Sequence, residues 1–148
     1  MEQAHKANLD VLILCGGLGT RLKEAGHNMP KPMVKINGRP FLEILIEYIS
    51  SFGFRRFILC TGFKSKVIED YFCKKNDGNT YVISSENKSL GTAGGIKNAE
   101  AHISSSSLLV LNGDSICQSN LKEFVEFHYA NNASASIAIT TVDDVHEY

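Results

Sequence analysis

The sequence predicts an α/β fold in which a mostly parallel sheet lies between two layers of helices. Short apolar runs without polar alternation recur along the chain, and such runs are typical of strands that are covered on both faces. Segments with apolar residues at helical spacing separate these runs. Because parallel strands need crossover connections, which these helices can supply, we expect a Rossmann-like, three-layer α/β/α architecture.

The expected elements follow from these two patterns. The runs that we expect to be strands span residues 10–15, 56–61, 80–84, 107–111 and 136–142. The helices that we expect between and after them span residues 40–52, 64–72 and 121–129. Pro40 suits the first position of its helix, and Gly53 is a natural stop. Asn120 followed by Glu123 is typical of a capping box.

Length and composition limit the class of protein. A chain of 148 residues with 43% hydrophobic content can bury one sizeable core, so we expect one domain over residues 1–148. The 15 basic and 16 acidic residues nearly cancel, and no basic run could follow a nucleic-acid backbone. No apolar run approaches the roughly 20 residues that cross a bilayer. The four cysteines lack CxxC spacing, so we expect buried free thiols in the cytoplasm, with no membrane or nucleic-acid partner.

Two segments interrupt the alternation of strands and helices. Residues 16–32 show no apolar periodicity, although loops in α/β folds usually have about two to six residues. Residues 85–95 follow the third expected strand and are rich in glycine. Since ligands of open α/β sheets bind beyond the carboxyl ends of the strands, both segments are candidate ligand-binding loops.

The first of these loops carries a phosphate-binding pattern. It begins with Gly16-Gly17-Leu18-Gly19-Thr20-Arg21, whose glycine amides can approach an anionic ligand closely. The dinucleotide fingerprint fails because Leu22 takes the place of its last glycine, and no glycine is followed by Lys-Ser or Lys-Thr as in Walker A. Pro30-Lys31-Pro32-Met33 then adds a lysine on stiffened backbone. Arg21 and Lys31 together suit a triphosphate, whereas the alternative is a flexible turn with two solvated cations.

Asp114 is the candidate metal ligand. It stands just past the fourth apolar run, at the edge of the expected sheet where the glycine loop also lies. A carboxylate oxygen at that edge suits Mg²⁺. The residues Asn-Gly-Asp-Ser around it are also typical of a turn, so spacing alone leaves both interpretations open.

Taken together, the two loops resemble a known family. Residues 16–22 and 30–33 resemble the signature of the sugar-1-phosphate nucleotidyltransferases, also called nucleoside-diphosphate-sugar pyrophosphorylases. The segments Asn37-Gly38-Arg39-Pro40-Phe41, Leu90-Gly91-Thr92-Ala93-Gly94-Gly95 and Leu111-Asn112-Gly113-Asp114 agree with that family in the same order. Within it, residues 14–17, 37–41 and 95–97 are most similar to heptose and mannose 1-phosphate guanylyltransferases.

The resemblance implies a reaction and a set of roles. A sugar phosphate oxygen would attack the α-phosphorus of a nucleoside triphosphate in line and release pyrophosphate, without a covalent enzyme intermediate. Arg21 and Lys31 would be the catalytic residues, because they would neutralise negative charge on the α-phosphate and the departing pyrophosphate. Asp114 would bind Mg²⁺. The nucleotide-binding residues that the resemblance implies are Leu14, Gly16, Gly17, Gly19, Thr20, Arg21, Lys31, Glu86, Gly91 and Thr92.

Glu86 bears on the choice of nucleobase. It lies where the family commonly places a side chain that contacts the base. Guanine presents adjacent N1–H and N2–H donors that one carboxylate can accept as a pair, whereas uracil and thymine suit an amide better. The resemblance together with this chemistry favours GTP, and a solvated loop glutamate is the alternative.

The resemblance also implies that part of the family's domain is missing. Residues 142–148 resemble a segment that the family has in mid-domain, before the half that supplies the sugar pocket and a second metal-binding aspartate. We therefore expect residues 1–148 to be the N-terminal nucleotide-binding portion, with little activity alone, and the identity of the sugar and any homo-oligomer stay open. A non-catalytic regulatory subunit that senses nucleotide sugars is the alternative, which retention of Arg21, Lys31 and Asp114 disfavours. A nicotinamide-dependent oxidoreductase is disfavoured by Leu22.

Overall fold

The computed structural model describes residues 9–17 and 29–141. The chain divides into two compact units, Met1–Cys117 and Gln118–Tyr148, which are described separately here. The first unit contains the sheet and the loops that the sequence marks as candidate binding segments. The ends of the chain and the middle of the first glycine loop lie outside the described residues.

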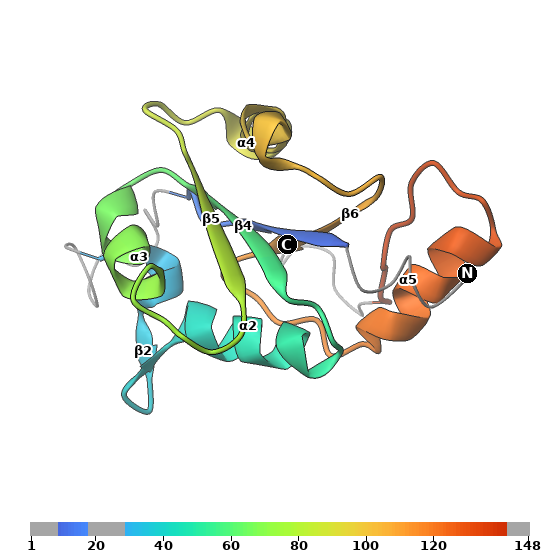
Figure 1. The fold of residues 1–148 in the computed structure, drawn as a ribbon, viewed down its shortest axis with the longest axis horizontal. Helices are drawn as coiled ribbons and strands as arrows, with labels where there is room; N and C mark the ends of the chain where they lie inside the picture. The colour runs from blue at the N-terminus through green and yellow to red at the C-terminus, as the bar shows by residue number, and fades with distance from the viewer. Residues whose placement is uncertain (1–8, 18–28, 142–148) are drawn as a thin grey trace. The chain divides into compact units, whose positions relative to one another are not determined.

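Four parallel strands form the sheet of the first unit (Figure 1). They are β1 (Asp10–Leu14), β4 (Arg56–Thr61), β5 (Thr80–Ser85) and β6 (Leu108–Asn112), in the spatial order β5-β4-β1-β6. Asp10 pairs with Arg56 of β4 and with Leu108 of β6, so all three strands begin in register. The parallel sheet and four of the five expected strands are confirmed, with bounds that differ by at most one residue at an end.

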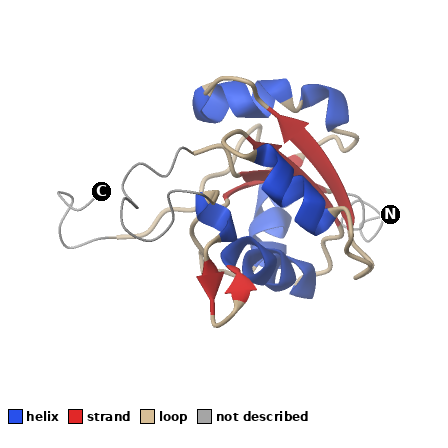
Figure 2. Cartoon of the chain, turned by 90° about the vertical axis from the view of Figure 1, so that its left-hand side faces the viewer, coloured by secondary structure: helices blue, strands red, loops and turns tan. Residues whose placement is uncertain are grey.

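Helices cover both faces of this sheet (Figures 1 and 2). The helices α2 (Phe41–Ser51) and α3 (Ser65–Phe72) lie on one face, and α4 (Gly91–Asn98) lies on the other. The three-layer architecture is therefore confirmed. α2 and α3 match the expected helices within one residue at each end, and Gly53 follows α2 with the expected left-handed backbone, at φ 95°.

One helix was not expected from the sequence. α4 forms within residues 85–95, where a glycine-rich loop was expected, and continues to Asn98. Glycine disfavours helices by roughly 1 kcal/mol relative to alanine, so local preference predicts no helix here. Tertiary packing explains it, because Ile96 and Ala99 pack against Leu12 and Ile58 of the sheet.

Short elements connect the strands. A 3-10 turn, η1 (Lys31–Met33), is followed by a two-stranded hairpin of β2 (Lys35–Ile36) and β3 (Arg39–Pro40), and a second 3-10 turn, η2 (Glu100–His102), follows α4. Pro40 was expected as the first helical residue of α2, but it caps the helix from extended backbone at ψ 137° because it also ends β3.

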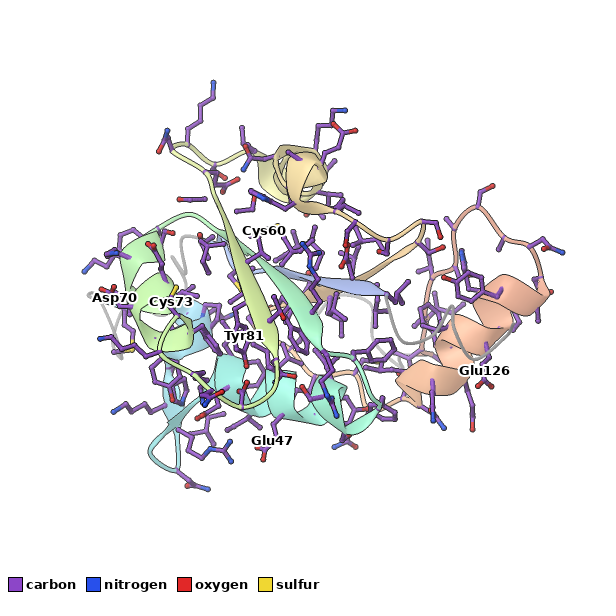
Figure 3. All side chains as sticks on the ribbon, in the orientation of Figure 1. Glu47, Cys60, Asp70, Cys73, Tyr81 and Glu126 are labelled. Carbon is purple, nitrogen blue, oxygen red and sulfur yellow. The ribbon has the colours of Figure 1, made fainter. Side chains whose placement is uncertain are left out.

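Two apolar layers fill the space between sheet and helices. On the α4 face, Leu12, Ile58 and Cys60 form a buried cluster, and Cys60 is labelled there in Figure 3. On the opposite face the rings of Phe57 and Tyr81 stack with centroids 5.9 Å apart. Figure 3 labels Tyr81 on this side of the sheet, toward α2. Strands covered on both faces explain why their sequences lack polar alternation.

A buried carboxylate ties the amino ends of the strands together. The Asp10 side chain is 1% exposed and accepts hydrogen bonds from Nη1 of Arg56 at 2.6 Å and from the amides of Ser104 at 2.6 Å and Ser105 at 3.0 Å. Burial alone would raise the pKa of Asp10, but these amides and the guanidinium outweigh burial and lower it. Asp10 therefore stays ionised and joins β1, β4 and the segment before β6.

Two further sequence expectations are wrong. The run 136–142 was expected to be a strand, but residues 136–141 are irregular, with Ile137 82% and Ile139 91% exposed. A strand needs a paired neighbour for its amides, which an apolar run cannot supply by itself. The four cysteines were expected to be buried free thiols; Cys15 and Cys60 are buried, whereas Cys73 and Cys117 are exposed.

The second unit contains one helix among its described residues, α5 (Leu121–Ala130). Its expected capping box is confirmed: Asn120 Oδ1 accepts from the amides of Lys122 at 3.1 Å and Glu123 at 3.3 Å, and its Nδ2 donates to Glu123. In the described part of the chain, no helix combines the length and apolar character needed to cross a membrane.

The Asp10 cluster makes the first prediction. Asp10→Asn removes the charge that the Arg56 guanidinium and two amides contact, so we expect a loss of about 2 to 4 kcal/mol in the free energy of unfolding at pH 7. Because the folded pKa of Asp10 is lowered, its contribution is present above the unfolded pKa of about 3.9 and is lost as the pH falls below it. Denaturant unfolding from pH 7 to pH 2.5 should show the two chains converging.

Asp70→Asn is the matched control. Asp70 forms an ion pair with Lys66 on α3, but its side chain is 55% exposed. Exposed pairs contribute less than about 1 kcal/mol, so this change should have little effect at any of these pH values. Equal losses from the two substitutions would contradict the role given to the buried carboxylate.

Candidate functional site

A pocket of about 260 Å³ opens at the carboxyl ends of the parallel strands. Its lining residues come from the ends of all four strands, from η1 and from the start of α4. They are Leu14, Cys15, Gly16, Gly17, Lys31, Pro32, Cys60, Glu86, Ser89, Gly91, Thr92, Asn112 and Asp114. Since parallel strands end at the same sheet edge, segments far apart in the sequence meet here, as expected for a ligand site of an open α/β sheet.

The floor of the pocket is the backbone that leaves β1. The amide of Cys15 donates to Cys60 O at 2.7 Å, which extends the pairing of β1 with β4 by one residue. Gly16 and Gly17 then carry the chain away from the sheet and line the pocket. Their place directly beyond a buried strand is the one at which glycine amides can approach a phosphate.

Close backbone contact also places Asp114. The amide of Gly113 donates to Leu14 O at 2.9 Å, and a Cβ on Gly113 would lie 2.8 Å from that same oxygen. Only glycine allows β6 to approach β1 so closely at its end. The next residue, Asp114, consequently reaches the pocket beside the glycine loop.

Lys31 and Asp114 form an ion pair at the pocket. Lys31 Nζ donates to Asp114 Oδ2 at 2.6 Å, and their side chains are 43% and 41% exposed. η1 holds Lys31 next to the buried Pro32, so the ammonium group starts from fixed backbone. An ion pair this exposed contributes less than about 1 kcal/mol, so a polyanionic ligand can compete for the lysine.

Glu86 and the start of α4 form another part of the pocket wall. The amide of Glu86 donates to Thr61 O at 2.8 Å, and its Oε2 accepts from the amide of Leu90 at 3.3 Å. Gly91 has φ 69° and, with Thr92, begins the helix at the pocket. The positive end of the helix dipole therefore lies in the same cavity as the lysine.

Asp114, the metal ligand expected from the sequence, has its carboxylate at the pocket. Within residues 9–17 and 29–141, no group of three or more His, Cys, Asp or Glu side chains could hold one. A single exposed carboxylate beside a lysine suits an oxygen-bound cation such as Mg²⁺ only when other oxygens complete its shell. Phosphate oxygens and water could provide them, so Asp114 fits a shared metal–phosphate site and not a metal site formed by protein alone.

The sequence-based site residues fall into two groups. Those that line the pocket are Leu14, Gly16, Gly17, Lys31, Glu86, Gly91, Thr92 and Asp114. Gly19, Thr20 and Arg21 lie outside the described residues. Residues from four separate sequence segments therefore border one cavity.

Some lining residues were missed by sequence reasoning. They are Cys15, Pro32, Cys60, Ser89 and Asn112, and each one adjoins an expected motif or strand end. Their position in the sequence, next to an expected motif or strand end, was the signal that could have found them. Residues that end or follow a parallel strand lie at the carboxyl edge of the sheet, where ligands bind. Residue type gave no such signal, because these side chains carry no charge.

The two buried cysteines are held in their neutral form. Burial, followed by the negative charge of Glu86, raises the pKa of Cys60 to about 11. Burial, followed by the Cys60 thiol and the Asp114 carboxylate, raises the pKa of Cys15 well above its ordinary value. A protonated thiol is a poor nucleophile, so neither cysteine is suited to covalent catalysis at neutral pH.

Comparison with known families and relatives agrees with the motifs. Residues 10–148 match the family described as Nucleotidyl transferase. The chain is 33% identical over 140 residues to a D-glycero-alpha-D-manno-heptose 1-phosphate guanylyltransferase of Aneurinibacillus thermoaerophilus, and 36% identical over 140 residues to a protein of the same name from Campylobacter jejuni. Each alignment covers 95% of this chain and 61% of the relative, so the chain spans about three fifths of their length.

Solved structures are similar over a comparable part. HddC from Yersinia pseudotuberculosis, complexed with GMP-PN, superimposes with a TM-score of 0.74 at 45% identity, covering 81% of this chain and 54% of that one. A UDP-glucose pyrophosphorylase complexed with UDP-glucose superimposes with a TM-score of 0.72 at 20% identity, covering 84% and 54%. At that lower identity the likeness concerns the fold alone.

The cysteines make the second prediction. At pH 8 only about 0.1% of a thiol with a pKa near 11 is ionised, so Cys60 should react very slowly with a thiol reagent, and Cys15 likewise. Titration of the native chain with a chromogenic disulfide should show two fast thiols, Cys73 and Cys117, and all four only in denaturant. Cys73→Ser should leave one fast thiol. Rapid reaction of a third thiol in the native chain would contradict the burial described here.

Proposed function

Because the chain belongs to the nucleotidyl transferase family, we propose that it forms the nucleotide-binding portion of a sugar-1-phosphate nucleotidyltransferase. The proposed reaction moves a nucleotidyl group from a nucleoside triphosphate, with GTP favoured, to a sugar 1-phosphate. The observation that carries this proposal is one pocket in which the glycine amides, Lys31, Glu86 and Asp114 meet at the carboxyl edge of the sheet.

The phosphate groups of the nucleotide are the part that the pocket suits best. Gly16 and Gly17 offer backbone amides at its floor, and Lys31 offers an ammonium group whose present partner is exposed. In the proposed reaction the sugar phosphate oxygen forms a bond to the α-phosphorus as the bond to the departing pyrophosphate breaks. Lys31, together with Arg21 from the rest of the glycine loop, would neutralise the charge on those oxygens.

The proposed metal is Mg²⁺, held by Asp114 and by phosphate oxygens of the nucleotide. The ion would withdraw electron density from the phosphates it touches and help to orient them. Asp114 would have to exchange Lys31 for the cation as the nucleotide enters. Since both partners already border the pocket, this exchange needs side-chain movement only.

Guanine is the proposed base. The carboxylate of Glu86 can accept the adjacent N1–H and N2–H donors of guanine, which no pyrimidine presents. The similarity to relatives named guanylyltransferases and to HddC complexed with GMP-PN supports this choice. The sugar remains unassigned, although the heptose and mannose 1-phosphate guanylyltransferases among the relatives make those two sugars the first to test.

We also propose that residues 1–148 lack a complete sugar site. The chain spans 61% of the heptose 1-phosphate relatives, and eight of the residues that line the described pocket are ones that we propose to bind nucleotide or its metal. The purified chain should therefore bind nucleotide but turn over slowly. We place this function in the cytoplasm, with a nucleoside triphosphate and a sugar 1-phosphate as its partners.

A panel of nucleotides tests the function. With Mg²⁺ present, GTP should raise the melting temperature of the chain more than ATP, CTP, UTP or dTTP at equal concentration. A ligand at a hundred times its dissociation constant adds about 2.7 kcal/mol of stability, which a thermal-shift assay resolves. Glu86→Gln should reduce the shift from GTP and increase the shifts from UTP and dTTP, because uracil and thymine suit an amide better than a carboxylate. A chain that no nucleotide stabilises would refute the proposal.

The exchange of partners at Asp114 predicts that Asp114→Asn changes the affinity for GTP in opposite directions without and with Mg²⁺. Without Mg²⁺, Asp114→Asn removes a negative charge near the phosphates and releases Lys31, so GTP should bind up to about fivefold more tightly. With Mg²⁺ the same variant should bind GTP more weakly than the unmodified chain, because the metal has lost its protein ligand. Isothermal titration calorimetry in EDTA and in Mg²⁺ measures both.

Lys31→Met is the control for that reversal. It removes a cation and leaves the carboxylate, so it should weaken GTP binding in both buffers. If Asp114→Asn changed the affinity in the same direction with and without Mg²⁺, the exchange between Lys31 and the metal would be wrong.

A further inference from the structure

The carboxylate of Glu86 lies against two glycines from different loops. A Cβ on Gly16, which follows β1, would be 2.8 Å from Glu86 Oε1. A Cβ on Gly62, which follows β4, would be 3.0 Å from the same oxygen. Neither approach is tolerated by a real side chain without movement, so the two missing Cβ atoms create the space that this oxygen occupies.

Backbone conformation does not explain the glycine at position 62. The glycines with positive φ in the described part of the chain are Gly38, Gly53, Gly78 and Gly91. Gly62 is not among them, so alanine would be allowed there by its backbone angles. What alanine would meet is Glu86 Oε1 at 3.0 Å, Gly16 O at 3.1 Å and Glu86 Cγ at 3.3 Å. Two of these three atoms belong to the glutamate.

The other side of the same carboxylate is also held. Oε2 accepts from the amide of Leu90 at 3.3 Å, and the backbone amide of Glu86 donates to Thr61 O at 2.8 Å. A methyl group at position 62 would thus displace Oε1 and disturb the bond from Leu90. Glu86 and Gly16 line the pocket and Gly62 does not, so position 62 would act on a ligand through these two residues, and the effect on the base would pass through the glutamate.

We propose that Gly62 is a positioning residue that sets the base selectivity of the pocket by leaving room for the carboxylate of Glu86. This inference rests on the proposed function, because it concerns how the same pocket selects guanine. A carboxylate accepts the N1–H and N2–H donors together only when both of its oxygens keep their orientation. Gly16 and Gly62 hold the space for one oxygen, and the Leu90 amide orients the other.

ITP is the probe that isolates this contact. Its base presents N1–H but lacks the 2-amino group, and the rest of the nucleotide matches GTP. The unmodified chain should bind GTP about tenfold more tightly than ITP, since a hydrogen bond to a charged group supplies at least that ratio. Gly62→Ala should reduce the ratio to about twofold or less, because GTP loses more contacts with the displaced carboxylate than ITP does, and the affinity for UTP should be unchanged. Competition against a fluorescent nucleotide in Mg²⁺ measures the dissociation constants of GTP, ITP and UTP.

The same substitution in a Glu86→Ala background is the control. Once the carboxylate is absent, Gly62→Ala has no glutamate to displace, so it should no longer change the GTP-to-ITP ratio. A purely structural effect of the alanine would weaken all nucleotides alike and would persist in this background. Either of those results would overturn the inference.

Thermal unfolding of the nucleotide-free chains tests the crowding without any ligand. Gly62→Ala alone should lower the melting temperature, and the double variant with Glu86→Ala should recover most of that loss. This comparison stays informative even if the single variant folds poorly, because the double variant should then fold. A double variant as unstable as Gly62→Ala would show that the alanine clashes elsewhere and would overturn the proposal.

The outcomes separate this inference from the proposed function. If the unmodified chain binds no nucleotide, the proposed function fails and the inference fails with it. If it binds GTP and ITP equally well, the nucleotide-binding function stands and the inference alone is refuted.

Discussion

The parallel alignment of four strands is the constraint on which the rest of the first unit depends. β1 pairs with β4 and β6 in parallel, and β5 pairs with β4 in the same sense, so their carboxyl ends meet at one edge. Parallel strands require a crossover between each pair, and α2, α3 and α4 lie within these crossovers. The loops that leave the carboxyl ends are consequently brought together, and the pocket lies where they converge.

The two ends of this sheet serve different purposes. At the amino ends, the ionised Asp10 is buried and fully engaged by Arg56 and two serine amides, so its charge contributes to stability. At the carboxyl ends, Lys31 and Asp114 pair while still exposed to solvent. A pair in water exchanges partners at little cost, whereas a buried one does not. The charges that are proposed to meet the nucleotide and its metal therefore lie at the exposed edge.

Glycine acts at that edge mainly by its lack of a side chain. Gly113 lets β6 approach β1, and Gly16 and Gly62 leave space for Glu86. None of these three has a positive φ, so the requirement at each comes from contact and not from backbone conformation. The shape of the pocket is thus determined by close approach between loops, which the proposed selection of guanine would depend on.

The sequence by itself determined the fold class, four strands, α2, α3, α5 and the motifs that surround the pocket. Those features depend on local information: apolar periodicity, a capping box at Asn120, and glycine or proline at loop positions. Tertiary structure alone decided the rest. α4 forms in a glycine-rich segment because Ile96 and Ala99 pack on the sheet, and residues 136–141 stay irregular although their apolar pattern resembles a strand. The pairing of Lys31 with Asp114 and the contact of Glu86 with Gly62 join residues distant in sequence, and only the packing of the sheet brings such residues together.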